Sequence, residues 1–259
     1  MAAIPKQPPV GQNSLSQEAA CPARLVWTDA STLTLEKFGG SRVTNLLTGE
    51  VQDISTEPTV TDTGLSNGVL YEILFDTSDG TLSADEDGFS TTDGIDHHPT
   101  NTSQLLVGWA YVTGGAFADD EANRHVVSRY HARPTEVVDA ANSSLNETAN
   151  ETIQTLGTTP TISFVAHPDY AYDVTASAAT RHDGAASDWT RIYIFRDSTQ
   201  VSETPPAIGG AEYHQNMVRA QEKLSAGQYD LTIRAEGRNA SPNTFDLRGQ
   251  QQLSGIVWT

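Results

Sequence analysis

The sequence is poor in positive charge. It contains 15 Lys and Arg residues against 33 Asp and Glu residues, a formal net charge of −18, and its only lysines among 259 residues are Lys6, Lys37 and Lys223. Because binding to a phosphate backbone requires clustered Lys and Arg side chains, this composition argues against nucleic acid as a partner. The acidity is typical of proteins that must stay soluble, including those of saline habitats, and we favour this reason over cation binding.

Cysteine and long apolar runs are scarce as well. Cys21 is the only cysteine, which excludes an internal disulfide and a thiolate cluster for a metal ion. No apolar run approaches the roughly 20 residues of a membrane-spanning helix. The N-terminus lacks a basic region followed by an apolar core, so we expect neither a secretory signal nor insertion into a membrane.

Short apolar runs separated by Thr, Ser, Gly, Asn and Asp predict an all-β fold. The clearest strand covers residues 104–112, where side chains alternate and should form two faces. One face would comprise Leu105, Val107, Trp109 and Tyr111, and the other Leu106, Gly108, Ala110 and Val112. Gly114 and Gly115 predict a tight reversal, and residues 124–131 alternate again as a return strand. A helix over residues 118–132, capped by Asp119 and Asp120, is the alternative.

The sequence divides into four segments. Residues 1–20 contain Pro5, Pro8 and Pro9 and little apolar surface, which predicts an extended N-terminal arm. A first β module should span residues 21–133, with the polar stretch 84–103 as a long loop. Residues 134–160 are rich in Asn, Thr, Ser and Ala and predict a linker, or a short neck between identical chains through a heptad-like seam at Val138, Ala141, Leu145 and Thr148.

Residues 161–259 form the fourth segment. Apolar alternating runs recur in it at intervals of about ten residues, and this spacing predicts a C-terminal β-sandwich of jelly-roll type. The strongest run is WTRIYIFR at residues 189–196.

One stretch carries residues of the types that bind metal ions. Asp93, Asp96, His97 and His98 lie close in sequence to Asp85, Glu86 and Asp87. Carboxylates and imidazoles together bind divalent ions, but the closing glutamate of an EF-hand loop is absent. We therefore favour a solvated acidic loop over a metal site.

The sequence contains no recognisable catalytic motif. It lacks the Gly-x-Ser-x-Gly elbow, the His-Glu-x-x-His helix and the phosphate-binding glycine loop. We predict no catalytic, cofactor-binding or metal-binding residue, although paired carboxylates of a glycoside hydrolase are identified only by their separation in space. Five aromatic residues are candidates for stacking on sugar rings, with core packing as the favoured interpretation for most of them: Tyr170, Tyr172, Trp189, Tyr193 and Tyr213.

The order of segments in the first module resembles a known family. LSNG at residues 65–68, YEILFD at 71–76 and SDGTL at 78–82 precede a polar stretch, and LLVGWAYV at 105–112, GAFAD at 115–119 and VVSRY at 126–130 follow it. This order, over about residues 20–133, resembles a module of virion structural proteins of tailed bacteriophages, of the tail-fibre and head-fibre type. LSAGQYDLTIRAEG at 224–237 resembles the trimeric jelly rolls related to tumour necrosis factor.

The resemblance implies a non-enzymatic protein of the virion. The N-terminal arm would dock onto other virion proteins of the tail or the capsid, residues 21–133 would form a base, and the sandwich would face outward and bind a host-surface glycan. A homotrimer is the implied assembly. The alternatives are a capsid decoration or cement protein that stabilises the head, a cell-surface carbohydrate-binding protein, and a depolymerase.

Overall fold

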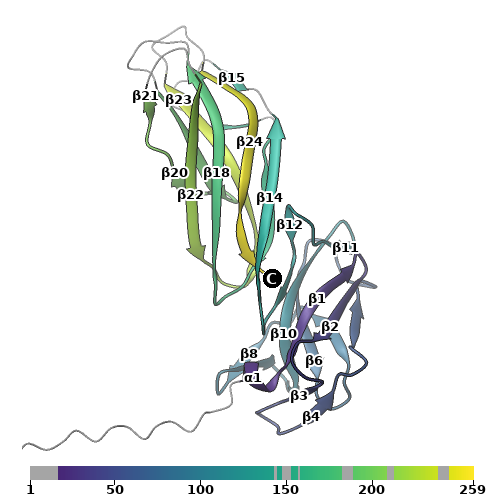
Figure 1. The fold of residues 1–259 in the computed structure, drawn as a ribbon. Helices are drawn as coiled ribbons and strands as arrows, with labels where there is room; N and C mark the ends of the chain where they lie inside the picture. The colour runs from purple at the N-terminus through teal and green to yellow at the C-terminus, as the bar shows by residue number, and fades with distance from the viewer. Residues whose placement is uncertain are drawn as a thin grey trace, which may run out of the picture.

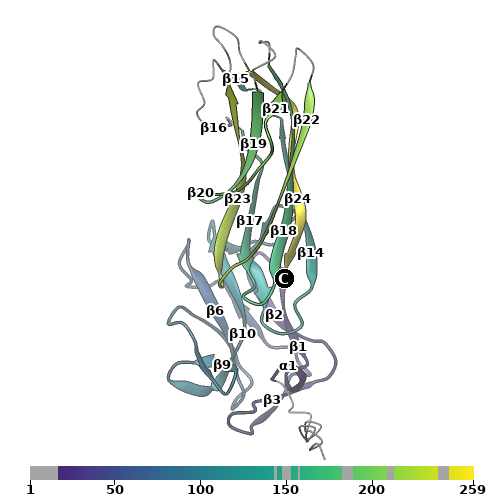
Figure 2. The same cartoon turned by 90° about the vertical axis from the view of Figure 1, so that its left-hand side faces the viewer.

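The computed structural model describes residues 17–142, 145–147, 153–156, 158–182, 189–208, 213–238 and 245–259. Two β modules lie one above the other along the long axis of the molecule (Figures 1 and 2). Within the described ranges the only helix is α1 (Gln17–Ala20), which confirms the all-β prediction. No helix of this part of the chain is long and apolar enough to cross a membrane. Most of the predicted arm, residues 1–16, lies outside the described residues.

The last four residues of the predicted arm belong to the first module. Gln17 and Ala20 of α1 are buried. The Gln17 side chain donates a hydrogen bond to the carbonyl oxygen of Thr44 and accepts one from the backbone N–H of Leu46. The arm prediction is therefore wrong for residues 17–20, because a glutamine anchors this turn through backbone groups that the sequence does not reveal.

The first module packs a small sheet on a large one. The small sheet has the order β1 (Ala23–Asp29), β2 (Thr32–Lys37), β5 (Thr59–Thr61), and a separate hairpin joins β3 (Arg42–Thr44) to β4 (Val51–Asp53). The large sheet has the order β7 (Leu82–Asp85), β6 (Leu70–Asp76), β10 (Asn101–Thr113), β9 (Ile95–His98), β8 (Ser90–Thr92), and β11 (Ala116–Phe117) and β13 (Val126–Ser128) also pair with β10. Leu25, Leu35, Ile73 and Leu105 share the buried core between them.

A β-bulge changes the faces of β10. The register with β6 shifts between Leu106 and Gly108, so that Leu105, Val107, Ala110 and Val112 face the module core while Leu106, Trp109 and Tyr111 face the other side. The predicted division of these side chains is therefore wrong beyond Val107, because an inserted residue reverses the alternation that follows it. A Cβ atom at Gly108 would lie 2.3 Å from the carbonyl oxygen of Val127.

The predicted reversal after this strand is confirmed. Gly114 and Gly115 have φ angles of 62° and 79°, and Val112 and Thr113 of β10 pair with Phe117 and Ala116 of β11. Residues 118–132 contain β12 (Asn123–Arg124) and β13 and no helix, so the helical alternative is wrong.

The polar stretch 84–103 is not a long loop. It contains β8, β9 and the start of β10, and its centre is buried at Ile95, Asp96 and His97. The loop prediction is wrong because polar side chains fill these strands and find partners inside the protein: Asp96 binds Arg129, and His97 contacts Thr92.

The second module is a β-sandwich of two sheets. The first has the order β14 (Pro134–Asn142), β24 (Phe245–Trp258), β18 (Ala171–His182), β22 (His214–Lys223), with β15 (Leu145–Glu147) also on β24. The second has the order β17 (Thr161–Ala166), β23 (Gly227–Arg238), β19 (Trp189–Arg196), β20 (Thr199–Glu203), with β16 (Gln154–Thr155) on β23 and β21 (Ala207–Ile208) on β19. Inward residues of both sheets, such as Val137, Val174, Ile192 and Ile233, form one core.

This strand order is that of a jelly roll. If the eight long strands are counted along the chain, the sheets read first, eighth, third, sixth and second, seventh, fourth, fifth, as two interleaved Greek keys produce. The C-terminal sandwich prediction is confirmed, but its start at residue 161 and the linker over 134–160 are wrong. Residues 134–142 form β14, which pairs with β24 along its whole length and buries Val137.

The heptad-like neck is also not observed. Val138 and Ala141 lie in the extended strand β14, and Leu145 lies in β15. Thr148 lies outside the described residues. The spacing of three and four residues therefore belongs to strand residues rather than to a helical seam.

Candidate functional site: the junction between the modules

A parallel ladder joins the two modules. Asn123 and Arg124 of β12, which follow the first module's hairpin, pair with Ser163 and Phe164 of β17. The backbone N–H of Ser163 donates to the carbonyl oxygen of Ala122 over 2.9 Å, and that of Val138 donates to Glu121 over 2.8 Å. The first module thus contributes the edge strand to a sheet of the sandwich, and relative rotation of the modules would break backbone hydrogen bonds.

A buried cluster lies beside this ladder. Leu74, Leu106, Trp109 and Val127 of the first module contact Val165 of the sandwich, and all five are almost fully buried. Trp109 belongs to this cluster because the bulge in β10 turns its side chain away from the module core. The indole Nε1 of Trp109 is buried and has no hydrogen-bond partner among the described residues, so packing rather than hydrogen bonding holds this ring.

Charged side chains cross the junction as well. The Arg129 guanidinium binds Asp96 of β9 over 2.8 Å and also Asp169, which follows β17 in the sandwich. The hydrogen bond from Arg129 holds the pKa of Asp169 below its usual value, so Asp169 is charged at neutral pH. One guanidinium therefore bridges two carboxylates and ties the β8–β9 hairpin to the sandwich, which the several donors of arginine allow.

Two histidines are enclosed at the same place. The imidazole Nε2 of His125 lies 2.8 Å from the Ser163 hydroxyl, and His167 packs edge-on against Trp109. Burial lowers the pKa of both His125 and His167. Both are neutral at pH 7, because desolvation disfavours the charged form.

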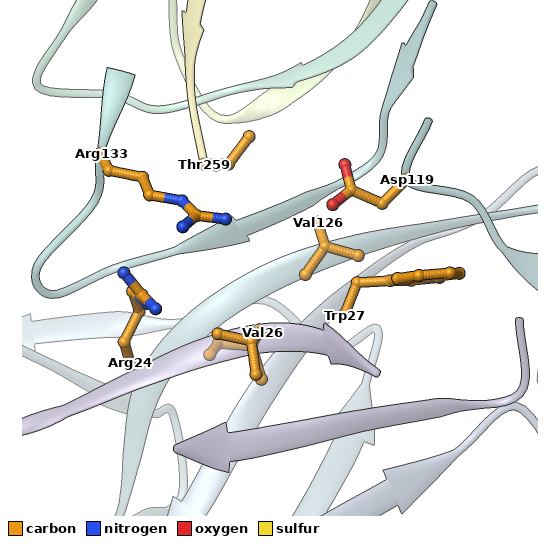
Figure 3. Close-up of a pocket in the computed structure, with 8 residues that line it drawn as sticks. Arg24, Val26, Trp27, Asp119, Val126, Arg133 and Thr259 are labelled. Carbon is orange, nitrogen blue, oxygen red and sulfur yellow. The ribbon is translucent and has the colours of Figure 1, made fainter. Parts of the chain in front are cut away.

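Figure 3 shows a small cavity on another side of the junction. Arg24 and Trp27 of β1 and Val126 of β13 line it from the first module, together with Asp119, Arg133 and Thr259. Its volume of about 50 Å³ accommodates a few water molecules rather than an organic substrate. Arg24 already binds Glu36 over 3.0 Å and Asp119 binds Arg124 over 3.2 Å. The cavity is therefore a part of the packing between the modules.

The acidic stretch brings together a different set of residues from the one the sequence suggests. Asp96 and His97 are turned inward, as described above, and Asp93 lies in the β8–β9 turn with a φ of 52°. In the described part of the chain, Asp85, Asp87 and His98 place their potential ligand atoms within 4.8 Å of one another. We call these three residues the acidic cluster. The imidazole Nε2 of His98 lies 3.5 Å from the Asp85 carboxylate.

The acidic cluster also affects a neighbouring carboxyl. Burial raises the pKa of Glu72, and the nearby charges of Asp85 and Asp87 raise it further. Three potential ligands at the rim of a sheet offer fewer oxygens than the six to eight that calcium takes. The geometry therefore fits a solvated acidic surface better than a dedicated ion site.

The five aromatic candidates divide between interior and surface. Tyr172 packs in the sandwich core, Tyr193 is buried and donates to Glu236, and the Arg191 guanidinium covers the Trp189 ring at 4.8 Å. Tyr170 and Tyr213 are exposed to 38% and 41%, and Tyr170 stacks on Trp258. Only two of the five rings are therefore substantially accessible.

Comparison with known proteins yields weak similarities. No protein-family model matches the sequence, and no curated protein matches it. A structure of infectious bursal disease virus strain Gx is 10% identical with a TM-score of 0.28; the match covers 75% of this chain and 57% of the viral chain. A structure of carbohydrate-binding modules of the β-sandwich superfamily is 10% identical with a TM-score of 0.21; the match covers 93% of this chain and 99% of the module's chain.

A cyclase from Fischerella sp. TAU is 11% identical with a TM-score of 0.25; the match covers 46% of this chain and 75% of the cyclase chain. Similarities at this level carry no argument about function. A functional conclusion therefore rests on the residues of the chain itself.

Proposed function

We propose that this chain is a structural protein of a tailed-bacteriophage virion, a fibre-like appendage that docks to the particle at one end and contacts the host surface with its sandwich. The observation that supports this most is the junction. A shared ladder, a buried cluster and an arginine bridge turn two β modules into one rod. A rod that transmits position without deforming is what an appendage requires.

The ends of the rod suit the two tasks. α1 lies at the first module, far from β15 and β21 at the other end of the sandwich (Figure 1). The proline-bearing residues 1–16 precede α1, and we assign to them the docking contact with the tail or the capsid. The order of segments 65–130 favours the same assignment through its resemblance to phage fibre modules.

An enzyme is the less favourable alternative. Catalytic sites combine a water-excluding pocket with converging ionisable groups of perturbed pKa. The cavity of Figure 3 is small, and its Arg24 and Asp119 side chains are already paired with neighbours. His125 is buried and contacts the Ser163 hydroxyl. His167 lines a second cleft of about 180 Å³, but the Arg129 and Asp169 side chains beside it are bound to each other.

The proposal is tested by labelling intact particles with an antibody against the sandwich and gold-conjugated secondary antibody. We expect gold on the particle, and a variant in which residues 1–16 are replaced by a Gly-Ser segment of equal length should fold but leave the particles unlabelled. The α1 anchor is untouched by this replacement, so folding is preserved. Gold spread evenly over the head would favour a decoration protein, gold on the producing cell would favour a cell-surface protein, and incorporation of the Gly-Ser variant would refute the docking arm.

A further inference from the structure

A polar groove runs along one flank of the sandwich. β20 is the edge strand of one sheet and β22 the edge strand of the other, and the two lie side by side (Figure 1). The Ser202 hydroxyl of β20 donates to the carbonyl oxygen of Arg219 in β22 over 2.7 Å and fixes their spacing. The groove between them has a volume of about 270 Å³, close to the lower end of the ~300–1,000 Å³ of small-molecule sites.

The floor of the groove is a compensated ion pair. The Arg196 guanidinium donates to the Glu222 carboxylate, and the Tyr172 hydroxyl donates to the same oxygen over 3.3 Å. Burial raises the pKa of Tyr172 to about 12, so its hydroxyl remains a donor at neutral pH. The positive and negative charges cancel, and the floor is uncharged although the chain carries a net charge of −18.

The walls offer hydrogen-bonding groups that are free to take a ligand. In the described part of the chain, no hydrogen bond engages the side-chain amide of Gln221 or the hydroxyl of Thr199, and both residues are exposed. The Gln200 amide nitrogen donates to Glu203 over 3.1 Å, which leaves its carbonyl oxygen as an acceptor. Amides and hydroxyls present donors and acceptors side by side, as a ligand hydroxyl does.

We infer that this groove binds a neutral, hydroxyl-rich ligand, a short segment of an uncharged saccharide. The inference rests on the proposed attachment function and names its ligand class and its site. A neutral ligand is favoured because Arg196 and Glu222 neutralise each other and leave no charge to recognise. A peptide is disfavoured because strand addition needs apolar pockets for alternate side chains, whereas the apolar lining of the groove consists of Val201, Ala220 and the buried ring of Tyr172.

The groove lacks an exposed aromatic ring, which has a consequence for affinity. Stacking contributes much of the binding energy where sugars meet aromatic side chains, and the Tyr172 ring is buried beneath the floor. A single groove should therefore bind weakly. Several grooves on one particle would compensate through effective concentration, which can exceed a single affinity by about 10²–10⁴.

The test is binding of the full chain, clustered on fluorescent beads, to an array of neutral and uronic-acid-containing glycans. We expect signal on neutral glycans, and losses of about tenfold for Gln221→Ala and for Thr199→Ala, since each removes one hydrogen bond to the ligand. Gln215→Ala is the matched control, because Gln215 is an exposed residue of the same strand about 20 Å from Gln221.

No signal on any neutral glycan, signal confined to acidic glycans or to a peptide array, or wild-type binding by both groove variants would overturn the inference. Circular dichroism of each variant establishes that the fold is intact. The labelling experiment separates the two proposals. Gold on particles without binding to the glycan array would refute the saccharide site and keep the virion role. Binding to the array without gold on particles would refute the virion role and keep the saccharide site.

Discussion

The substitution Gly108→Ala tests the β-bulge that creates the junction. Gly108 lies at the register shift between β10 and β6, where β13 also approaches β10. An added Cβ atom would lie 2.3 Å from the carbonyl oxygen of Val127 and 2.6 Å from Cδ2 of Leu25. The Leu25 side chain can rotate away, but the Val127 carbonyl belongs to the β10–β13 ladder. The backbone of β13 must therefore move.

The cost follows from what this movement disrupts. β13 is held by its pairing with β10 and by the hydrogen bond from the Leu25 N–H to the Ser128 hydroxyl, and its Val127 packs in the junction cluster. Overpacking of a tight core costs about 1–3 kcal/mol, and a clash with backbone belongs at the upper end. We expect a loss of about 3 kcal/mol in the free energy of unfolding. For a chain of this size this corresponds to a fall in Tm of roughly 6–12 °C.

Thermal unfolding followed by circular dichroism measures the effect. Gly39→Ala is the control, because no atom lies within 4 Å of a Cβ atom placed there and its φ is not in the left-handed region. The control should change stability by about 1 kcal/mol or less. Equal Tm values for Gly108→Ala and the wild type would refute the assignment of the bulge and of the faces that it sets.

Three further predictions concern the junction and the acidic cluster. Trp109→Phe should lower the free energy of unfolding, measured by chemical denaturation, by about 1 kcal/mol or less, because it removes an N–H that has no partner. Trp109→Ala should lower it by about 3–5 kcal/mol, because it leaves a cavity. Equal losses for the two variants would contradict this. The pKa values of His125 and His167 are lower in the folded chain than in the unfolded chain, so as the pH falls these imidazoles bind protons in the unfolded chain before they do so in the folded chain. The stability that these residues contribute is complete above their unfolded pKa of 6.5 and is lost as the pH falls from there through the folded pKa, so the urea midpoint should fall less with acidification in a His125→Gln, His167→Gln variant than in the wild type. Chelation with EDTA should leave the Tm unchanged, and a rise on calcium addition that is lost in Asp87→Asn would show that the acidic cluster binds the ion.

The sequence predicted the strands that alternate strongly and missed those that do not. Runs such as residues 70–76 and 189–196 carry large apolar side chains, and most of these side chains are buried in the structure. β14 buries Val137 but otherwise consists largely of small and polar residues, so its composition resembles a linker. Its place in the sheet is set by β24, more than a hundred residues later in the chain. Local pattern does not contain that information.

The candidate site was harder to predict for a similar reason. The acidic stretch was found by composition, yet the partner that withdraws Asp96 from it is Arg129, which the sequence separates from it by 33 residues. The β12–β17 ladder uses backbone groups, which leave no trace in residue types. The bulge at Gly108 gave the one available signal, a glycine inside a strand, and it changes which side chains reach the junction.

The most direct test of the account is the distance between the two modules in solution. Spin labels at Thr61→Cys in β5 and Gln215→Cys in β22 probe one exposed position on each module, and the native Cys21 should stay unlabelled because it is buried and its pKa is raised to about 12. Pulsed electron–electron double resonance should give one narrow distance distribution, unchanged between the isolated chain and the particle. A broad distribution would show that the modules move independently, and would contradict the rigid rod on which the proposed function rests.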